Sequence, residues 1–311
     1  MDKKIPVVAV VGPTASGKTE LGIALAKRLG GEIVSADSMQ VYRGIHIASA
    51  APDTAEMQGI RHHLLEFLDV DDEFSVCDYV NLASKTISDI NKRGKLPIIV
   101  GGTGLYVNSL LENIDFGEQQ SDKELRRKLA EEYDTLGGDA MLERVRAADE
   151  EYGARLHAND KKRIVRALEI ISAGETVSER LAKSKAEPSP YDVLYIGVNF
   201  RDRQKLYDRI NRRVDIMLGN GLLEEAKASF ETELKTASQA IGHKELFSFF
   251  EGEQSLDEAV ENLKMQTRRY AKRQLTWFGR NEKIVWLYKD EEDVISKTIE
   301  LADRFLKSKE E

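Results

Sequence analysis

The first apolar segment of the chain is a continuous, β-branched run at residues 5–11 that meets a glycine-rich turn. A helical repeat of leucines then follows and stops at a pair of glycines. Further strand patterns occupy residues 32–36 and 96–100, with a helical pattern at about 75–93 between them. Buried strands that alternate with helices predict an α/β fold with a parallel sheet covered on both faces.

From about residue 115 the pattern changes to charged helical sequence, which ends at Pro188-Ser189-Pro190. We interpret residues 115–190 as an inserted, all-helical domain. Strand pattern returns at 192–200, and helices and a last strand follow to the end of the chain. The predicted core domain therefore combines residues 1–114 with residues 191–311. The later elements are predicted at 202–218, 222–234 and 255–278 (helices) and at 283–288 (strand).

The turn after the first strand fits the pattern G-x-x-x-x-G-K-[ST] and lies between a strand and a helix, as this phosphate-binding loop requires. Its backbone N–H groups and the positive end of the helix dipole would converge on phosphate oxygens. Lys18 adds a positive charge, and the Thr19 hydroxyl is a candidate Mg²⁺ ligand. The predicted diphosphate-binding residues are Gly12, Pro13, Thr14, Ala15, Ser16, Gly17, Lys18 and Thr19.

Such a loop reads only phosphates, so other residues must identify the reaction. The strand at 96–100 ends in Gly101-Gly102-Thr103-Gly104, where many ATPases carry an aspartate. Asp37 is the acid that directly follows a buried strand near the loop. Its position admits two readings, a carboxylate pointing at the reacting centre or a cap on the next helix. Arg209, Arg212 and Arg213 likewise form either a phosphate site or a solvated basic face.

The net charge of −8 argues against a nucleic-acid partner, but basic residues cluster at 157–166, 201–213 and 264–280. In the helix at 255–278 we expect the charged residues to face RNA and the aromatic residues to pack in the core. No stretch has the length and apolarity of a membrane helix, so we expect a cytoplasmic protein with no membrane partner. The single cysteine, Cys77, excludes an internal disulfide.

Seven blocks of the chain resemble, in the same order, those of the tRNA dimethylallyltransferase family. They span residues 12–278 and read GPTASGKT, ADSMQVYRG, HHLL, LPIIVGGTGLY, HANDKKRIVRALE, AIGHKE and RRYAKRQLTWF. The resemblance implies a P-loop NTPase-like core and a bacterial-type enzyme. Its implied reaction transfers a dimethylallyl group from dimethylallyl diphosphate, with Mg²⁺, to N6 of the adenosine 3′ of the tRNA anticodon.

The resemblance also implies roles for particular residues. Asp37 would be the general base, Thr103 and Arg213 would hold the diphosphate side, and the protein would act as a monomer on the anticodon stem-loop. The residues implied in tRNA binding are Asp37, Ser38, Met39, Gln40, Thr103, Arg126, Lys162, Arg163, Ile164, Val165, Arg166, Gln239, Ala240, Ile241, Gly242, His243 and Lys244.

The chain departs from the family pattern at residues 46–52, which read HIASAAP in place of D-I-G-T-A-K-P, and at His243, where a tyrosine is usual. Two other functions remain open at this point. A small-molecule or nucleotide kinase could use the same loop and Asp37, and an RNA-binding module could keep the fold without chemistry. The basic helices and the Gly-Thr strand end favour the prenyltransferase over the kinase.

Overall fold

The computed structural model describes residues 4–114, 122–232 and 240–308. These residues form two compact units, each treated separately below. One unit combines Met1–Leu111 with Pro190–Glu311, and the other is Glu112–Ser189. No helix among the described residues is long and apolar enough to cross a membrane.

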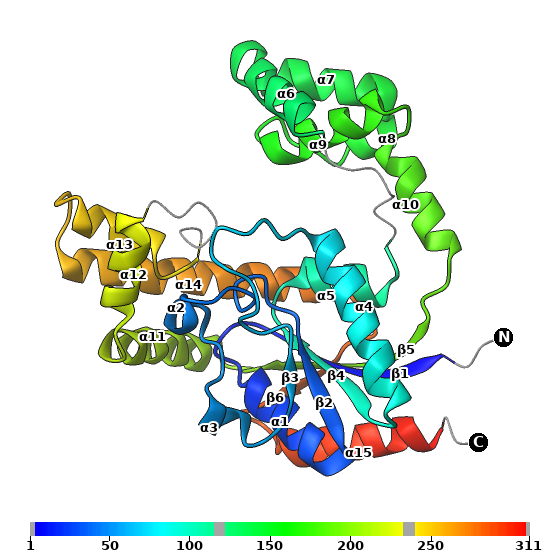
Figure 1. Ribbon diagram of the computed structural model, residues 1–311, viewed down its shortest axis with the longest axis vertical. Coiled ribbons are helices and arrows are strands. Elements are labelled where there is room, and N and C mark those ends of the chain that lie inside the picture. The colour runs from blue at the N-terminus through cyan, green and yellow to red at the C-terminus, as the bar shows by residue number, and fades with distance from the viewer. Residues whose placement is uncertain (1–3, 115–121, 233–239, 309–311) are drawn as a thin grey trace. The chain divides into compact units, whose positions relative to one another are not determined.

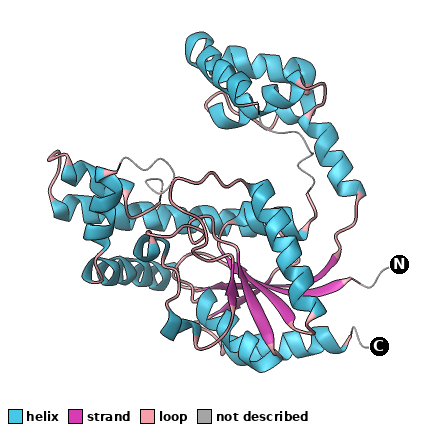
Figure 2. Ribbon diagram, viewed as in Figure 1, coloured by secondary structure: helices cyan, strands magenta, loops and turns pink. Residues whose placement is uncertain are grey.

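The first unit is built on a six-stranded sheet in which all strand pairs are parallel (Figure 2). The strand order is β3-β2-β4-β1-β5-β6, so the predicted parallel α/β sheet is confirmed. One edge strand, β3, was absent from the sequence prediction because two residues are too few to show a pattern. The strands are β1 (Ile5–Val11), β2 (Gly31–Ser35), β3 (His62–His63), β4 (Leu96–Gly101), β5 (Tyr191–Asn199) and β6 (Val285–Tyr288).

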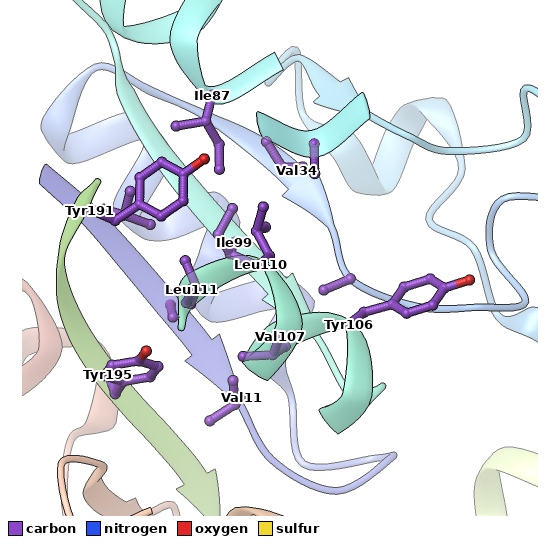
Figure 3. Close-up of a cluster of buried hydrophobic side chains, with 14 of the residues drawn as sticks. Val11, Val34, Ile87, Ile99, Tyr106, Val107, Leu110, Leu111, Tyr191 and Tyr195 are labelled. Carbon is purple, nitrogen blue, oxygen red and sulfur yellow. The ribbon is translucent and has the colours of Figure 1, made fainter. Parts of the chain in front are cut away.

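Alternate residues of the central strand β1 face two separate hydrophobic cores, which explains its continuous apolar run. Val7, Ala9 and Val11 lie in the core beneath α4 (Val76–Lys92) and α5 (Gly104–Leu111). Figure 3 shows Leu110 and Leu111 of α5 over Ile99 and Val11 of that sheet face. Val8 and Val10 lie in the opposite core with α1 (Lys18–Leu29) and α15 (Val294–Lys307), and Figure 1 shows the two helix layers.

The remaining helices of this unit lie mainly beyond the carboxyl ends of the strands, which is the region of the site. The long helix α14 contacts both α11 and α13 along its length. The predicted helix at 222–234 ends at Glu231. These helices are α2 (His46–Ser49), α3 (Thr54–Met57), α11 (Arg203–Gly219), α12 (Leu222–Glu231), α13 (Lys244–Phe250) and α14 (Leu256–Phe278).

The described part of the second unit contains helices and loops around its own core, which includes Leu129, Met141, Leu156 and Ile164. Its first helix starts at Lys123, because the Asp122 side chain accepts hydrogen bonds from the amides of Glu124 and Leu125. The helices are α6 (Lys123–Leu136), α7 (Gly138–Ala148), α8 (Glu150–Gly153), α9 (Lys161–Ser172) and α10 (Val177–Ala186).

Candidate active site

Three loops with polar or glycine residues meet beyond the carboxyl ends of β1, β2 and β4, three neighbouring strands. The phosphate-binding loop follows β1, Asp37 follows β2, and Gly102 and Thr103 follow β4. Open parallel sheets bind ligands at this edge. The loops are in contact, since the Thr103 amide donates to the Ala36 carbonyl at 3.1 Å.

The phosphate-binding loop has the backbone that its sequence predicts. Gly12 has φ 143°, and a Cβ there would lie 2.3 Å from the Val198 carbonyl oxygen, so only glycine fits. Gly17, with φ 91°, precedes the first residue of α1, which is Lys18. The Lys18 ammonium group donates a hydrogen bond back to the Pro13 carbonyl at 2.7 Å. The lysine therefore lies across the loop that a phosphate would occupy.

Lys18 and Arg213 are two basic side chains that repel each other, and Asp37 and Glu56 are acids near this pair. Burial, together with the nearby Arg213 guanidinium, lowers the pKa of Lys18 to about 7, and Asp37 opposes this shift. Burial also lowers the pKa of Arg213, against the attraction of Asp37 and Glu56. A bound diphosphate would add negative charge beside this pair, and an opposite charge nearby favours the protonated forms.

Two pockets open on this pair of cations. The larger, about 720 Å³, is lined by the loop, by residues 46, 47 and 50–53, and by Arg209, Arg212 and Arg213 of α11. The smaller, about 360 Å³, is lined by Asp37 and its neighbours and by α14. Both pockets share the lining residues Lys18, Thr19, Ala50, Arg213 and Met217. A ligand held by its phosphates at Lys18 could thus lie in one pocket and react with a group in the other.

Asp37 lies in the smaller pocket and does not cap a helix. Its Oδ1 accepts a hydrogen bond from the Met39 amide at 2.9 Å, which closes a turn, and the next helix, α2, begins only at His46. Of the two readings of the sequence, the helix cap is therefore wrong. The other carboxylate oxygen accepts no hydrogen bond from the described residues, so it remains available to a ligand in the pocket.

Thr103 organises the loops around Asp37. Its Oγ1 accepts a hydrogen bond from the Ser38 amide at 3.0 Å, and it also interacts with Tyr270 of α14. Burial and the neighbouring Asp37 raise the pKa of Tyr270, whereas its hydrogen bonds with Thr103 and Gln274 oppose the rise. Tyr270 lines the smaller pocket, so the expectation that the aromatic residues of this helix pack in the core is wrong for Tyr270. For Trp277, which packs against the core under α5, it is confirmed.

Gln274 of α14 connects the two glycine-rich loops. Its Oε1 accepts a hydrogen bond from the Thr14 amide at 2.8 Å, and its Nε2 donates to the Gly102 carbonyl at 3.0 Å. A Cβ at Gly102 would lie 2.2 Å from that Nε2, so the glycine permits the contact. Neither Gln274 nor Tyr270 was predicted from the sequence as a site residue. One signal in the sequence could have identified Gln274. It is a polar residue one helical turn before Phe278, so it lies on the buried face of the helix, where a polar side chain needs a partner.

We expect Gln274→Met to lower the free energy of unfolding by about 1–3 kcal/mol, because a thioether of similar size leaves the Thr14 N–H and the Gly102 C=O without their partner. Denaturant unfolding monitored by circular dichroism would measure this change in the free energy of unfolding. Gln266→Met, on the same helix but bonded only locally to Asn262, is the matched control. Equal stabilities of the two variants would contradict the bridge.

The other residues of the core unit implied in tRNA binding fall into two groups. Ser38, Met39, Ile241 and Lys244 line the smaller pocket, as does Gln40. The Gln40 amide, however, is engaged internally, with Ser35 Oγ at 2.9 Å and the Ala50 carbonyl at 3.1 Å. The second group is buried and comprises Ala240, Gly242 and His243. Gln239 lies outside the described residues.

In the helical unit, two of the residues implied in tRNA binding hold the same buried carboxylate. Arg126 and Arg166 both bind Glu169, at 2.9 and 2.8 Å. Burial would raise the pKa of Glu169, but the hydrogen bonds from Arg166 and Arg126 outweigh it and lower the pKa. Lys162 and Arg163 are exposed. Ile164 and Val165 belong to the core of the unit, so their side chains hold α9 in place.

The site could hold a magnesium ion that is coordinated mainly by the phosphate groups of a bound ligand and by water. Thr19, the predicted Mg²⁺ ligand, lines both pockets, and its hydroxyl is an oxygen ligand of the kind that Mg²⁺ prefers. Within the described residues, no group of three or more His, Cys, Asp or Glu side chains gathers as a metal site. Mg²⁺ at such a site takes its other ligands from phosphate groups and water.

Comparison with known proteins agrees with this geometry. The family model described as IPP transferase matches residues 40–282. The tRNA dimethylallyltransferase of Acetivibrio thermocellus is 45% identical over 297 residues, which cover 94% of this chain and 95% of the relative.

Two solved structures are also similar. The full-length tRNA isopentenylpyrophosphate transferase of Bacillus halodurans is 41% identical, with a TM-score of 0.72 and coverage of 98% of this chain and 97% of that one. A eukaryotic dimethylallyltransferase acting on tRNA is 28% identical, with a TM-score of 0.85 and coverage of 98% and 80%. With its phosphate-binding loop, paired pockets and near full-length similarity to these proteins, the chain belongs to the IPP transferase family of tRNA dimethylallyltransferases.

Proposed function

We propose that this protein transfers the dimethylallyl group of dimethylallyl diphosphate to N6 of the adenosine 3′ of the anticodon in tRNA and releases diphosphate. The observation that carries the proposal is the pair of pockets that meet at Lys18 and Arg213, one rich in cations and the other containing Asp37. The kinase alternative is not favoured, because the relatives are named tRNA dimethylallyltransferases.

The donor would bind in the larger pocket. The loop amides, Lys18 and Arg213 would hold the diphosphate, and Arg209 and Arg212 line the same pocket. Thr19 would ligate Mg²⁺, which would supply positive charge to the diphosphate as it leaves. The Thr14 amide is already bonded to Gln274, so the phosphate contacts fall to the other amides of the loop.

The acceptor adenine would enter the smaller pocket, flipped out of the anticodon stack because its amine is otherwise out of reach. There N6 attacks C1 of the dimethylallyl group, and the bond from C1 to the diphosphate oxygen breaks with its electron pair going to the diphosphate. Asp37 takes the proton from N6. Lys18 and Arg213 stabilise the charge that grows on the leaving group. Thr103 keeps the turn that carries Asp37 in place through the Ser38 amide.

The rest of the tRNA would be held by positive side chains of the two units. On the helical unit the exposed Lys162 and Arg163 suit phosphates, and Glu169 orients Arg126 and Arg166. On the core unit Lys244 and Arg273 line the pocket that would receive the adenine. We further propose a monomer that works in the cytoplasm, where its tRNA substrate would be found.

The test is the mass of an unmodified anticodon stem-loop incubated with the protein, Mg²⁺ and dimethylallyl diphosphate. We expect the stem-loop with adenosine 3′ of the anticodon to gain one dimethylallyl group, located on that nucleoside by fragmentation. A stem-loop with guanosine at the same position is the control and should gain none. An unchanged mass for the adenosine stem-loop at saturating donor would overturn the proposed function.

A further inference from the structure

The short helix α2 and the residues that follow it form the wall between the two pockets. His46, Ile47, Ala51 and Pro52 face the larger pocket, and Ala48 and Ser49 face the smaller one. Ala50 lines both, in a left-handed conformation with φ 46°. The donor and the acceptor would therefore meet past this segment, and a shift of its backbone would change the passage between them.

A largely enclosed carboxylate from another helix fixes the start of this wall. Glu225 of α12 accepts hydrogen bonds from the amides of Ile47 at 2.8 Å and Ala48 at 2.9 Å. Its side chain is 12% exposed. Burial would raise the pKa of Glu225, but the hydrogen bonds from His243 and from these two amides outweigh it and lower the pKa. The carboxylate is thus ionised and accepts bonds that the short helix cannot make internally.

His243 holds Glu225 in turn. Its Nε2 lies 2.9 Å from Glu225 Oε1, and the residue is fully buried. The other ring nitrogen, Nδ1, has no hydrogen-bond partner among the described residues, so the bond to Glu225 is the polar contact that orients the ring. At the far end of the wall Gln40 donates to the Ala50 carbonyl at 3.1 Å. The segment is therefore fixed at both ends by side chains from elsewhere in the chain.

From this arrangement we propose that Glu225, oriented by His243, is a positioning residue for the transfer reaction. It touches neither the donor nor the adenine and acts by keeping the wall where the allylic carbon and N6 can approach each other. A displacement of about 1 Å from a reactive geometry can lower a rate about 100-fold. A loosened wall would also admit water, which would attack C1 and release dimethylallyl alcohol and diphosphate. The reaction part of the inference depends on the proposed function.

Hydrogen exchange tests the contact without reference to activity. In Glu225→Ala the amides of Ile47 and Ala48 lose their acceptor, and we expect them to exchange at least about tenfold faster. Glu224→Ala is the matched control, since it removes an exposed carboxylate from the neighbouring position of the same helix. Unchanged exchange at both amides in Glu225→Ala would overturn the contact and, with it, the positioning role.

Activity tests the role itself. We expect kcat for stem-loop modification to fall about 10- to 100-fold in Glu225→Ala, with smaller changes in the KM values of donor and stem-loop. Glu225→Gln should recover part of the rate, because its carbonyl oxygen still accepts an amide hydrogen bond. The ratio of diphosphate released to adenosine modified should rise above that of wild type and Glu224→Ala.

These outcomes separate the two proposals. Wild-type protein that modifies no stem-loop would overturn the proposed function. Circular dichroism and thermal melting would give the folded fraction of each variant. If the wild type is active and Glu225→Ala has the same activity per folded molecule, the positioning role alone would be overturned. The positioning role would also be overturned if the lower rate of Glu225→Ala were fully explained by a smaller folded fraction and the ratio of diphosphate released to adenosine modified were unchanged.

Discussion

Asp37→Asn is expected to lower kcat for prenyl transfer about 100- to 10,000-fold, the range typical of a lost general base. The amide oxygen can still accept the hydrogen bond from the Met39 amide that the carboxylate accepts now, so the turn should survive. The amide nitrogen has no basicity with which to take the proton from N6. The affinity for the stem-loop should change less than about threefold, which is a smaller change in binding free energy than the loss of one hydrogen bond would cause.

Asp37→Ala provides the comparison, because it removes the base and the turn contact together. We expect it to abolish transfer and still to bind the stem-loop. Single-turnover rates with saturating stem-loop and fluorescence anisotropy for binding would separate chemistry from affinity. Normal chemistry with weakened binding in Asp37→Asn would contradict the role of Asp37 as the base and would assign it to tRNA recognition.

Lys18→Met is expected to weaken donor binding and to stabilise the ligand-free protein. Loss of a charged contact to the diphosphate should lower affinity about 10- to 100-fold, equivalent to about 1.5–3 kcal/mol. In the ligand-free protein the buried ammonium group is unfavourable, since its pKa is lowered to about 7 from 10.5. Removing it should raise the free energy of unfolding at pH 7 by about 1–3 kcal/mol.

The stabilisation should depend on pH in one direction. Between pH 7 and 10.5 the unfolded chain keeps the Lys18 proton more than the folded protein does, so the stability of the wild type rises with pH in this window. The cost of the charge is fully present below about pH 7 and is lost toward pH 10.5. The advantage of Lys18→Met should therefore shrink between pH 7 and 9, as denaturant unfolding without ligand would show.

Lys27→Met, on the exposed part of the same helix, is the control for removing a lysine charge and should show no such pH-dependent gain. Donor affinity can be measured by competition with inorganic diphosphate. Equal donor affinity in Lys18→Met and wild type would contradict the reading of the loop as a phosphate site. An advantage of Lys18→Met that is constant from pH 6 to 9 would contradict the burial of its charge.

The elements of the core were predictable wherever a long pattern marks them. The run at Ile5–Val11 is apolar on both faces because the strand lies between two helix layers, and the sequence alone predicts that environment. The helix ends also carry local signals, such as the Ser255 and Glu258 capping box of α14. The strand His62–His63 has no such signal, because its place depends on pairing with β2.

The candidate site divides in the same way. The loop from Gly12 to Thr19 is predictable because its conformation and its chemistry depend on residues next to one another. Asp37 was a candidate with two readings, and only the structure shows that it closes a turn in the smaller pocket. Gln274, Tyr270 and Glu225 act through contacts with loops far away in the sequence, and spacing along one helix does not reveal such contacts.

By itself, the sequence determined the parallel α/β core, the phosphate-binding loop and, through the order of seven motifs, the family. These properties follow from short-range patterns and from backbone conformations that particular residues require. The tertiary structure alone decided that two pockets share Lys18 and Arg213, that Gln274 joins the glycine-rich loops, and that Glu225 fixes the wall between the pockets. Each of these depends on groups brought together from distant parts of the chain, because buried polar atoms need partners that only the folded chain supplies.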